Sequence, residues 1–254
     1  MVDNLSFYPA IRVANLTVVY NTHTALMGIS GAIKSGIMMA IVGPNGAGKT
    51  TLLKAMIGLV RPVAGVVTFF GDDSHQKAQK YVAYVPQRKS VDWTFPATVF
   101  DVVLMGRFGR IGWIKRPKKE DYDAVYEALD CVGMSVHAHR SIGQLSGGQQ
   151  QRVFFARALV QNAEIYLLDE PFTGIDLATE HILVSLLRKL RDLGKTIVVV
   201  HHDLQTLRKY FDWMWLLNTR SIVQGPVEDV LYESHIVAAY GHKMAAEIPY
   251  IKEI

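Results

Sequence analysis

Two glycine-rich stretches of this chain could each bind an anion at the start of a helix. The first, GPNGAGKT from Gly43 to Thr50, fits the P-loop pattern. An apolar run that reads as a strand precedes it, and TLLKAMIGL, which reads as a helix, follows. The glycines allow consecutive backbone N–H groups to surround a phosphate, and the helix N-terminus adds partial positive charge. This arrangement predicts a nucleotide site.

Two side chains of the P-loop have specific tasks in phosphate chemistry. Lys49 would reach the β- and γ-phosphates, and the Thr50 hydroxyl would ligate Mg²⁺. The residues predicted to contact the nucleotide along this stretch are Gly43, Pro44, Asn45, Gly46, Ala47, Gly48, Lys49, Thr50 and Thr51.

Two acids follow the apolar run 165–168, in the stretch EIYLLDEP. Ligands of parallel α/β sheets bind beyond the carboxyl ends of the strands, so Asp169 and Glu170 are expected to face the phosphates. Asp169 suits a Mg²⁺ ligand, directly or through water. Glu170 can hold and polarise an attacking water as general base.

The second glycine-rich stretch is LSGGQ, in which Ser146 and Gln149 have the spacing of a capping box and so predict a helix start. A simple helix start needs neither Gly147 nor Gly148. The two glycines leave backbone N–H groups bare beside the serine hydroxyl, which favours an anion site. A glycine-rich helix start without a ligand is the alternative.

The elements that position these residues alternate between strands and helices, which predicts an α/β protein with a largely parallel sheet. The segment 85–146 lacks a strand pattern and is predicted to be a helical insertion. The predicted strands are 11–20, 37–42, 66–70, 81–85, 165–168, 196–200 and 213–217. The predicted helices are 49–59, 118–132, 149–161, 177–193 and 204–210.

The composition is that of a globular protein of 254 residues, with 50% hydrophobic and 20% charged residues. We expect one large domain, or a domain with a subdomain. No apolar run approaches the ~18 residues of a membrane span, and no secretory signal is visible. The lone Cys131 fits a reducing cytosol. The net charge of +4 is weak evidence, and the basic run 115–119 is either a solvated loop or a contact for anionic lipid.

The order of these motifs resembles the ATP-binding subunits of ABC transporters over nearly the whole chain. The resemblance rests on GPNGAGKT, on Gln87 after a strand, on LSGGQQQR, on YLLDEP and on VVVHHDL. In that family the signature serine and glycines bind the γ-phosphate of the ATP that the other subunit holds. The resemblance therefore implies Mg²⁺-dependent ATP hydrolysis by a homodimer with two shared sites.

The resemblance also implies an ABC ATPase fold. This fold has a P-loop core with a mainly parallel sheet, an N-terminal antiparallel β portion and an inserted helical subdomain. We expect residues 1–254 to form a single domain, with the helical subdomain at about 88–160.

Further site residues follow from the resemblance alone. Tyr20 matches the aromatic residue that stacks on adenine, although an aromatic at a strand end is also common in a core. Gln87 matches the glutamine that touches Mg²⁺ and the attacking water and that links to the membrane subunit. Asp176 matches an acid at the dimer seam, with helix capping as the alternative. His202 matches the switch histidine that contacts the γ-phosphate, and the adjacent His201 leaves open which of the pair points into the sheet.

The stretch VDWTFPATVFDVVLMGRFG at 91–109 resembles importers of manganese, zinc and iron. This implies integral-membrane permease subunits as partners, an indirect link to an extracytoplasmic metal-binding protein, and a place on the cytoplasmic face of the membrane. The metal itself cannot be read, because an ATPase subunit does not touch the cargo.

Five aromatic residues gather in or near this stretch, with few charges between them. Either they fill the core of the helical insertion, or some of them line a groove for a helix of a membrane partner. The aromatic cluster consists of Trp93, Phe95, Phe100, Phe108 and Trp113.

Other protein classes fit less well. DNA-repair ATPases with these motifs insert a long coiled coil, and too few positions separate Gln87 from Leu145 for one, so no nucleic-acid partner is expected. Translation-associated ATPases usually carry two such cassettes, and exporters are often fused to a membrane domain. A metal-sensing tail is disfavoured, because His235, His242 and Glu247 lack ligand spacing.

Overall fold

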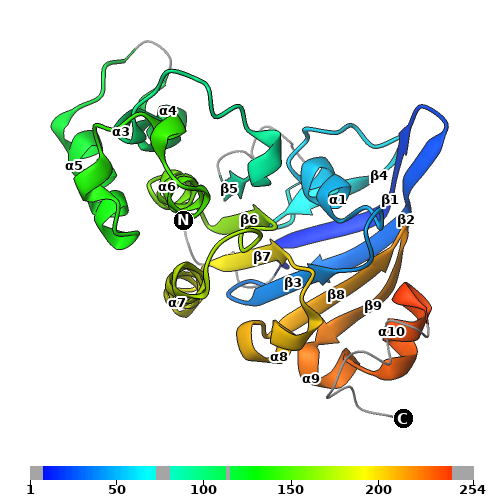
Figure 1. The fold of residues 1–254 in the computed structure, drawn as a ribbon. Coiled ribbons are helices and arrows are strands. Elements are labelled where there is room, and N and C mark those ends of the chain that lie inside the picture. The colour runs from blue at the N-terminus through cyan, green and yellow to red at the C-terminus, as the bar shows by residue number, and fades with distance from the viewer. Residues whose placement is uncertain (1–7, 73–80, 113–114, 242–254) are drawn as a thin grey trace.

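The computed structural model of the chain describes residues 8–72, 81–112 and 115–241, and its strands form two sheets (Figure 1). The larger sheet has the order β5-β6-β7-β3-β8-β9, and its last strand runs antiparallel to its neighbour. The smaller sheet is antiparallel, with the order β2-β1-β4. The strands are β1 (Ile11–Tyr20), β2 (His23–Ile33), β3 (Met38–Val42), β4 (Ala64–Phe69), β5 (Val82–Val85), β6 (Ile165–Asp169), β7 (Thr196–Val200), β8 (Trp213–Asn218) and β9 (Arg220–Pro226).

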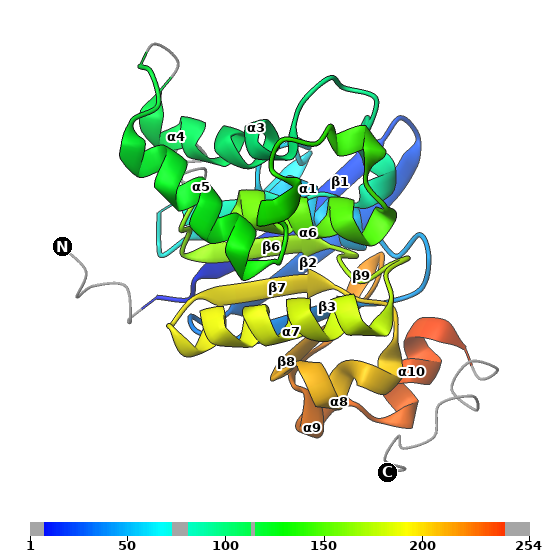
Figure 2. The ribbon, with the colours of Figure 1, turned by 60° about the vertical axis from the view of Figure 1, so that its left-hand side comes forward.

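Helices cover one face of the larger sheet, and Figure 2 shows α6 and α7 lying across it. The helix α1 lies on the other face, between the two sheets (Figure 1). The α-helices are α1 (Lys49–Met56), α3 (Val99–Leu104), α4 (Phe108–Ile111), α5 (Lys119–Cys131), α6 (Gly147–Leu159), α7 (Leu177–Asp192), α8 (Leu207–Tyr210), α9 (Val227–Val230) and α10 (Glu233–Tyr240). The 3₁₀ helices are η1 (Arg88–Ser90), η2 (Met105–Arg107), η3 (Ser135–His137), η4 (Ile142–Gln144) and η5 (Leu204–Thr206).

The central strands are covered on both faces, which explains their continuous apolar runs. Every residue of β3, β6 and β7 is buried. Successive side chains of a strand point to opposite faces. Ala40 and Val42 therefore join the core under the helices, whereas Met39 and Ile41 join the core shared with α1 and the smaller sheet. The two cores hold the carboxyl ends of these strands in fixed positions.

The predicted fold class is confirmed: a mainly parallel sheet, an antiparallel portion near the N-terminus and a helical insertion. Two strands were not predicted. In β2 the adjacent Ala25 and Leu26 are both buried and Gly28 adopts φ +62°, so the alternation of buried and exposed residues is broken. Most residues of the edge strand β9 are half-buried, and this strand shows no alternation either.

The segment between β5 and β6 is helical, as predicted, and it contains the short helix α3 that the sequence did not indicate. A capping box between Thr98 and Asp101 begins α3, and α3, α5 and α6 pack together. That 88–160 forms a subdomain within a single domain stays a prediction. Within the described ranges, no helix combines the length and hydropathy needed to cross a bilayer.

Candidate functional site

A pocket of about 270 Å³ opens at the P-loop, and its walls come from both sheets and from α1. The P-loop joins β3 to α1, so this pocket lies where the sequence predicted the nucleotide. The lining residues are Tyr20, His23, Ala25, Gly46, Ala47, Gly48, Lys49, Thr50, Thr51 and Glu170.

The backbone of the P-loop requires glycine at two positions. Gly48, the residue before α1, adopts φ +90°, and a Cβ there would lie 2.5 Å from the carbonyl oxygen of Ala25. A Cβ at Gly43 would lie 2.1 Å from the carbonyl oxygen of Leu217. Larger residues would force the loop away from the strands on which it rests. The glycines thus fix the turn as well as leaving N–H groups accessible.

Lys49 is folded back over the P-loop. Its Nζ donates to the carbonyl oxygens of Gly43 at 2.7 Å and Pro44 at 2.9 Å, and the residue is 7% exposed. Burial lowers the pKa of Lys49, while the carboxylates of Glu170 and Asp169 act in the opposite direction. A phosphate in the pocket would replace the two carbonyls as partner of this ammonium group.

Thr50 and Asp169 form a pair suited to a hard cation. The Thr50 hydroxyl donates to Asp169 Oδ1 at 2.9 Å, and Asp169 is 1% exposed. Asp169 Oδ2 is buried without a hydrogen-bond partner of normal geometry among the described residues. Burial raises the pKa of Asp169, because the charged form lacks solvation. A carboxylate and a hydroxyl are oxygen ligands of the kind Mg²⁺ prefers, so the residues present fit this ion.

Glu170 is held by a strained backbone and two hydrogen bonds. Its φ is +50°, in the left-handed region that is unfavourable for a residue with a Cβ. Gln87 Nε2 donates to Glu170 Oε2 at 2.7 Å, and Thr173 Oγ1 donates to the same oxygen at 3.3 Å. Gln87 follows β5 and Glu170 follows β6, so neighbouring parallel strands bring the two side chains together.

The LSGGQ stretch begins α6 as predicted. Ser146 is the N-cap, and its capping box with Gln149 is complete, with Ser146 N donating to Gln149 Oε1 at 2.9 Å. The Arg88 guanidinium covers Gly147, where a Cβ would lie 2.8 Å from Arg88 Cζ. Gly148 is therefore the more open of the two glycines, with Asp176 Oδ2 3.7 Å from a Cβ built there.

The two glycine-rich stretches do not meet within one chain. Ser146 and Gln149 do not line the P-loop pocket, and in the described part of the chain no hydrogen bond joins residues 146–149 to the P-loop. Asp176, next to the signature, is the N-cap of α7 and accepts from Thr179 N at 2.9 Å. Asp176 therefore caps α7, which is the alternative role that the sequence left open for this residue.

Besides the predicted Tyr20, the smaller sheet lines the pocket with two residues that were not predicted, His23 and Ala25. Tyr20, 44% exposed, ends β1, and the tight turn after it pairs Tyr20 with His23 at the start of β2. His23 and Ala25 line the pocket beside Tyr20. The only sequence signal was the short polar turn Asn21-Thr22, which could have indicated a hairpin.

The adjacent histidines after β7 differ in environment. His201 is 3% exposed, and its backbone N–H donates to the carbonyl oxygen of Ile41 at 3.0 Å. His202 is exposed. His201 is therefore the member of the pair that points into the fold. His202 follows a strand that lies between β3, which leads into the P-loop, and β6, which leads to Glu170.

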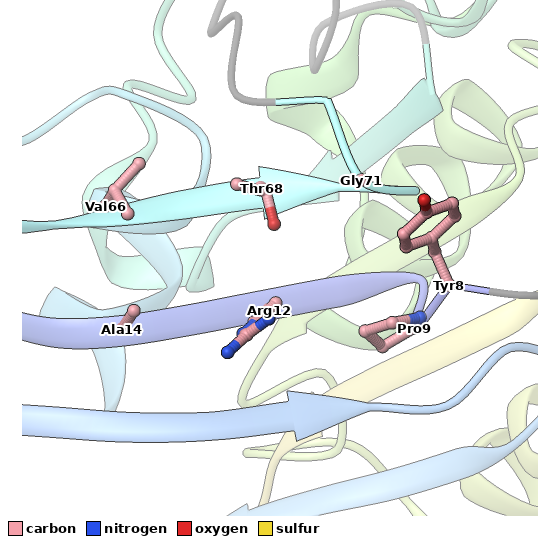
Figure 3. A pocket seen from close by; sticks show the side chains of 7 residues that line it. All are labelled: Tyr8, Pro9, Arg12, Ala14, Val66, Thr68 and Gly71. Atoms are coloured by element: carbon pink, nitrogen blue, oxygen red, sulfur yellow. The ribbon is translucent and has the colours of Figure 1, made fainter.

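A second pocket of about 270 Å³ lies over the paired strands β1 and β4, on the face of the smaller sheet that carries Arg12 and Thr68 (Figure 3). Tyr8 closes one end of it, and none of the predicted site residues lines it. In the tail, His235 contacts the carbonyl oxygen of Val230 at 2.8 Å through Nδ1, while His242 and Glu247 lie outside the described residues. The described ranges contain no group of three or more His, Cys, Asp or Glu side chains that could hold a metal ion.

Known proteins resemble this chain along most of its length. The manganese transport system ATP-binding protein MntB of Bacillus subtilis is 50% identical over 234 residues, which cover 92% of this chain and 93% of that protein. The zinc transport system ATP-binding protein TroB of Treponema pallidum is 50% identical over 239 residues, which cover 94% and 90%.

Solved structures agree with these relatives. A bacterial ABC transporter cassette solved as a dimer, MJ0796, matches with a TM-score of 0.76 and 29% identity over 85% of this chain and 98% of that one. The model of the family described as ABC transporter matches residues 26–173. The chain belongs to the ABC transporter family.

Proposed function

We propose that this chain is the ATP-hydrolysing subunit that powers import of manganese or zinc through a separate membrane permease. ATPase activity follows from membership of the ABC transporter family. The observation that carries the choice of cargo is the 50% identity, over more than nine tenths of the chain, to relatives from a manganese and a zinc transport system. The working place of such a subunit is the cytoplasmic face of the membrane, against its permease.

We propose the following roles for the residues around the P-loop. The backbone of the P-loop binds the phosphates and Lys49 neutralises the β- and γ-phosphates. Thr50 and Asp169 would hold Mg²⁺, and the ion would offset negative charge on the phosphates. Glu170 accepts a proton from the attacking water as general base. Gln87, 2.7 Å from Glu170, orients that carboxylate and the water.

Adenine binds to the wall of the pocket that β1 and β2 form. The exposed ring of Tyr20 offers an apolar face at the edge of the pocket, on which a base can stack. His202 stands beyond the carboxyl end of β7 and reaches the γ-phosphate when the site closes. Asp176 and the start of α6 form the face that meets the second subunit.

The site is completed by a second copy of the chain. Ser146 and the two glycines after it leave N–H groups at the start of α6, yet they do not line the pocket of their own P-loop. In a head-to-tail homodimer these groups bind the γ-phosphate of the ATP on the partner's P-loop. The dimeric cassette among the similar structures supports this arrangement.

A groove beside Gln87 is the proposed contact with the permease. A pocket of about 400 Å³ lies there, with Pro86, the residue before Gln87, in its mixed apolar and polar wall. Gly106, in η2, packs against α6 so closely that a Cβ would lie 2.4 Å from the carbonyl oxygen of Arg157, a residue of α6 that lines this pocket. The lining residues are Ile57, Leu59, Val82, Tyr84, Pro86, Arg157 and Gln161.

Some members of the aromatic cluster are packed against other rings and others are exposed, and the exposed members support the contact with the permease. Trp93 packs edge to face on Phe154 at 4.9 Å, and Phe100 stacks on Tyr122 at 5.7 Å. Two other members point outward: Phe95 is 56% exposed and Phe108 is 50% exposed. Trp113, the fifth member, lies outside the described residues. The exposed pair is available to a partner helix.

Replacing Phe108 by Asp tests this surface. We expect the melting temperature to change little, because Phe108 is half exposed, while the permease no longer co-purifies from detergent. ATP binding should stay intact. Leu193→Asp is the matched control, since Leu193 is 76% exposed at the end of α7, on a different helix. Retention of the permease together with a lower melting temperature would assign Phe108 to the core instead.

The proposed function is tested by transport itself. The tagged chain is isolated from detergent-solubilised membranes with its partners, and the complex is reconstituted into vesicles. We expect a multi-spanning protein to co-purify and ATP to drive uptake of manganese or zinc, with each metal competing against the other. A complex that hydrolyses ATP but moves neither metal would refute metal import. A chain with no membrane partner would refute transport altogether.

A further inference from the structure

His201 is a buried polar residue that the proposed chemistry does not use. Four aromatic or imidazole rings surround it: Phe172 at 5.7 Å, Phe211 at 5.2 Å, Tyr210 at 6.5 Å and His202 at 6.0 Å between ring centroids. An apolar side chain would fill this space without the cost of burying a ring nitrogen. The imidazole therefore calls for an explanation in terms of its hydrogen bonds.

The hydrogen bonds of His201 run along the turn that carries His202. His201 Nε2 lies 2.7 Å from Thr206 Oγ1, and Thr206 Oγ1 lies 3.1 Å from Asp203 Oδ2. Burial lowers the pKa of His201 to about 4, although the Asp203 carboxylate opposes this, so the ring is neutral at pH 7. A neutral imidazole has one N–H to donate.

The direction of this chain of hydrogen bonds follows from its last member. The Asp203 carboxylate and the Asp203 backbone carbonyl oxygen, which is 3.2 Å from Thr206 Oγ1, can only accept, and the Thr206 hydroxyl has a single hydrogen, so Thr206 donates to Asp203. Thr206 must then accept from His201, which places the ring hydrogen on Nε2. Asp203 Oδ1 also accepts from Gln205 N at 2.9 Å. Both carboxylate oxygens of Asp203 thus accept hydrogen bonds from within the turn 201–206, and these bonds fix its conformation.

The position of His201 connects this turn to the rest of the site. Its backbone N–H bonds to Ile41, one residue before the last residue of β3, and its ring packs edge to face on Phe172, two residues after Glu170. His202 is the next residue and is exposed. One buried ring therefore contacts the turn that carries His202 and the segment that follows Glu170.

We propose that His201, through its hydrogen bond to Thr206, is a positioning residue that holds His202 in the orientation required for ATP hydrolysis. The inference rests on the proposed function and adds to it a second histidine, which does not touch the nucleotide. His201 acts by fixing the turn 201–206, so that His202 reaches the γ-phosphate without an ordering cost at each turnover. The ring contact with Phe172 fixes the position of the segment after Glu170 relative to the same turn.

The test uses a matched pair of variants at Thr206, which is only partly buried and lies outside the pocket. Thr206→Val keeps the shape and removes the hydroxyl, whereas Thr206→Ser keeps the hydroxyl. We expect Thr206→Val to lower kcat about tenfold with KM for ATP unchanged, as for a lost interaction that acts in the transition state. Thr206→Ser should restore kcat to near the wild-type value. All rates are measured below the melting temperature of every variant.

A second readout follows His202 directly. In a Glu170→Gln background, which allows ATP to stay bound, ATP should shift the ring resonances of His202 in the wild-type turn and in Thr206→Ser. In Thr206→Val we expect the shift to be smaller or absent. An unchanged kcat in Thr206→Val, or a failure of Thr206→Ser to restore it, would overturn the inference. A wild-type protein without ATPase activity would instead refute the proposed function.

Discussion

Glu170→Gln is expected to lower kcat for ATP hydrolysis on the order of 10²-fold or more, while the affinity for ATP stays near that of the unmodified protein. The amide keeps the size of the side chain and can still occupy the position held by Gln87 and Thr173. It cannot accept a proton from water. The loss therefore isolates the general-base step from nucleotide binding, and it is measured as kcat together with the equilibrium Kd for ATP.

Asp169→Asn is the matched control for this experiment, because it changes the neighbouring carboxylate in the same way. Asp169 contacts Thr50 and is assigned to Mg²⁺, so its amide variant should weaken the Mg²⁺-dependent part of ATP binding. Glu170→Gln should leave that part unchanged. Near-normal turnover in purified Glu170→Gln protein would show that another group activates the water.

The parts of the fold that the sequence predicted are those with strong periodic patterns. The strands β3, β6 and β7 are buried on both faces, so their apolar runs are continuous and easily found. The bulged β2 lacks such a pattern because its backbone irregularity breaks the alternation. The edge strand β9 lacks one because its central residues are all half-buried, whichever face they lie on. The helices α9 and α10 are too short to show a clear period.

In the site, too, local motifs could be predicted from the sequence, whereas contacts between distant residues could not. The P-loop is a local motif, and the strand and helix around it were enough to predict the pocket. The contact between Gln87 and Glu170 spans 83 positions and depends on the order of strands in the sheet, which a single sequence does not display. The pairing of Tyr20 with His23 depends on a turn that the sequence analysis did not identify. Which of His201 and His202 points into the fold depends on where the rings of distant residues pack, and these rings surround His201.

The second large effect is expected from combining two inactive proteins. Lys49→Ala removes the ammonium group over the P-loop but leaves the start of α6 unchanged. Ser146→Arg places a long side chain at the signature and leaves the P-loop of the same chain unchanged. Each homodimer then has two damaged sites. A mixed dimer has both lesions in one site and an intact second site, because each site takes its P-loop and its signature from different chains.

The mixture should therefore recover ATP-locked dimers although neither mutant forms them alone. The experiment is done in a Glu170→Gln background, because steady turnover can require both sites and would hide a single repaired one. Trapped ATP is measured after removal of free nucleotide, and mixed dimers are counted with two different tags. The matched control is a mixture of differently tagged Lys49→Ala chains, which cannot form an intact site.

Trapped ATP in the mixed dimer of Lys49→Ala and Ser146→Arg is the most direct test of the claim that the two glycine-rich stretches serve one nucleotide from two chains. Sites shared between two chains predict up to one trapped ATP per mixed dimer, and none above background in either homodimer. If both stretches served a nucleotide within one chain, every chain in the mixture would carry a damaged site. Mixed dimers that form but trap no more ATP than the homodimers would contradict the account.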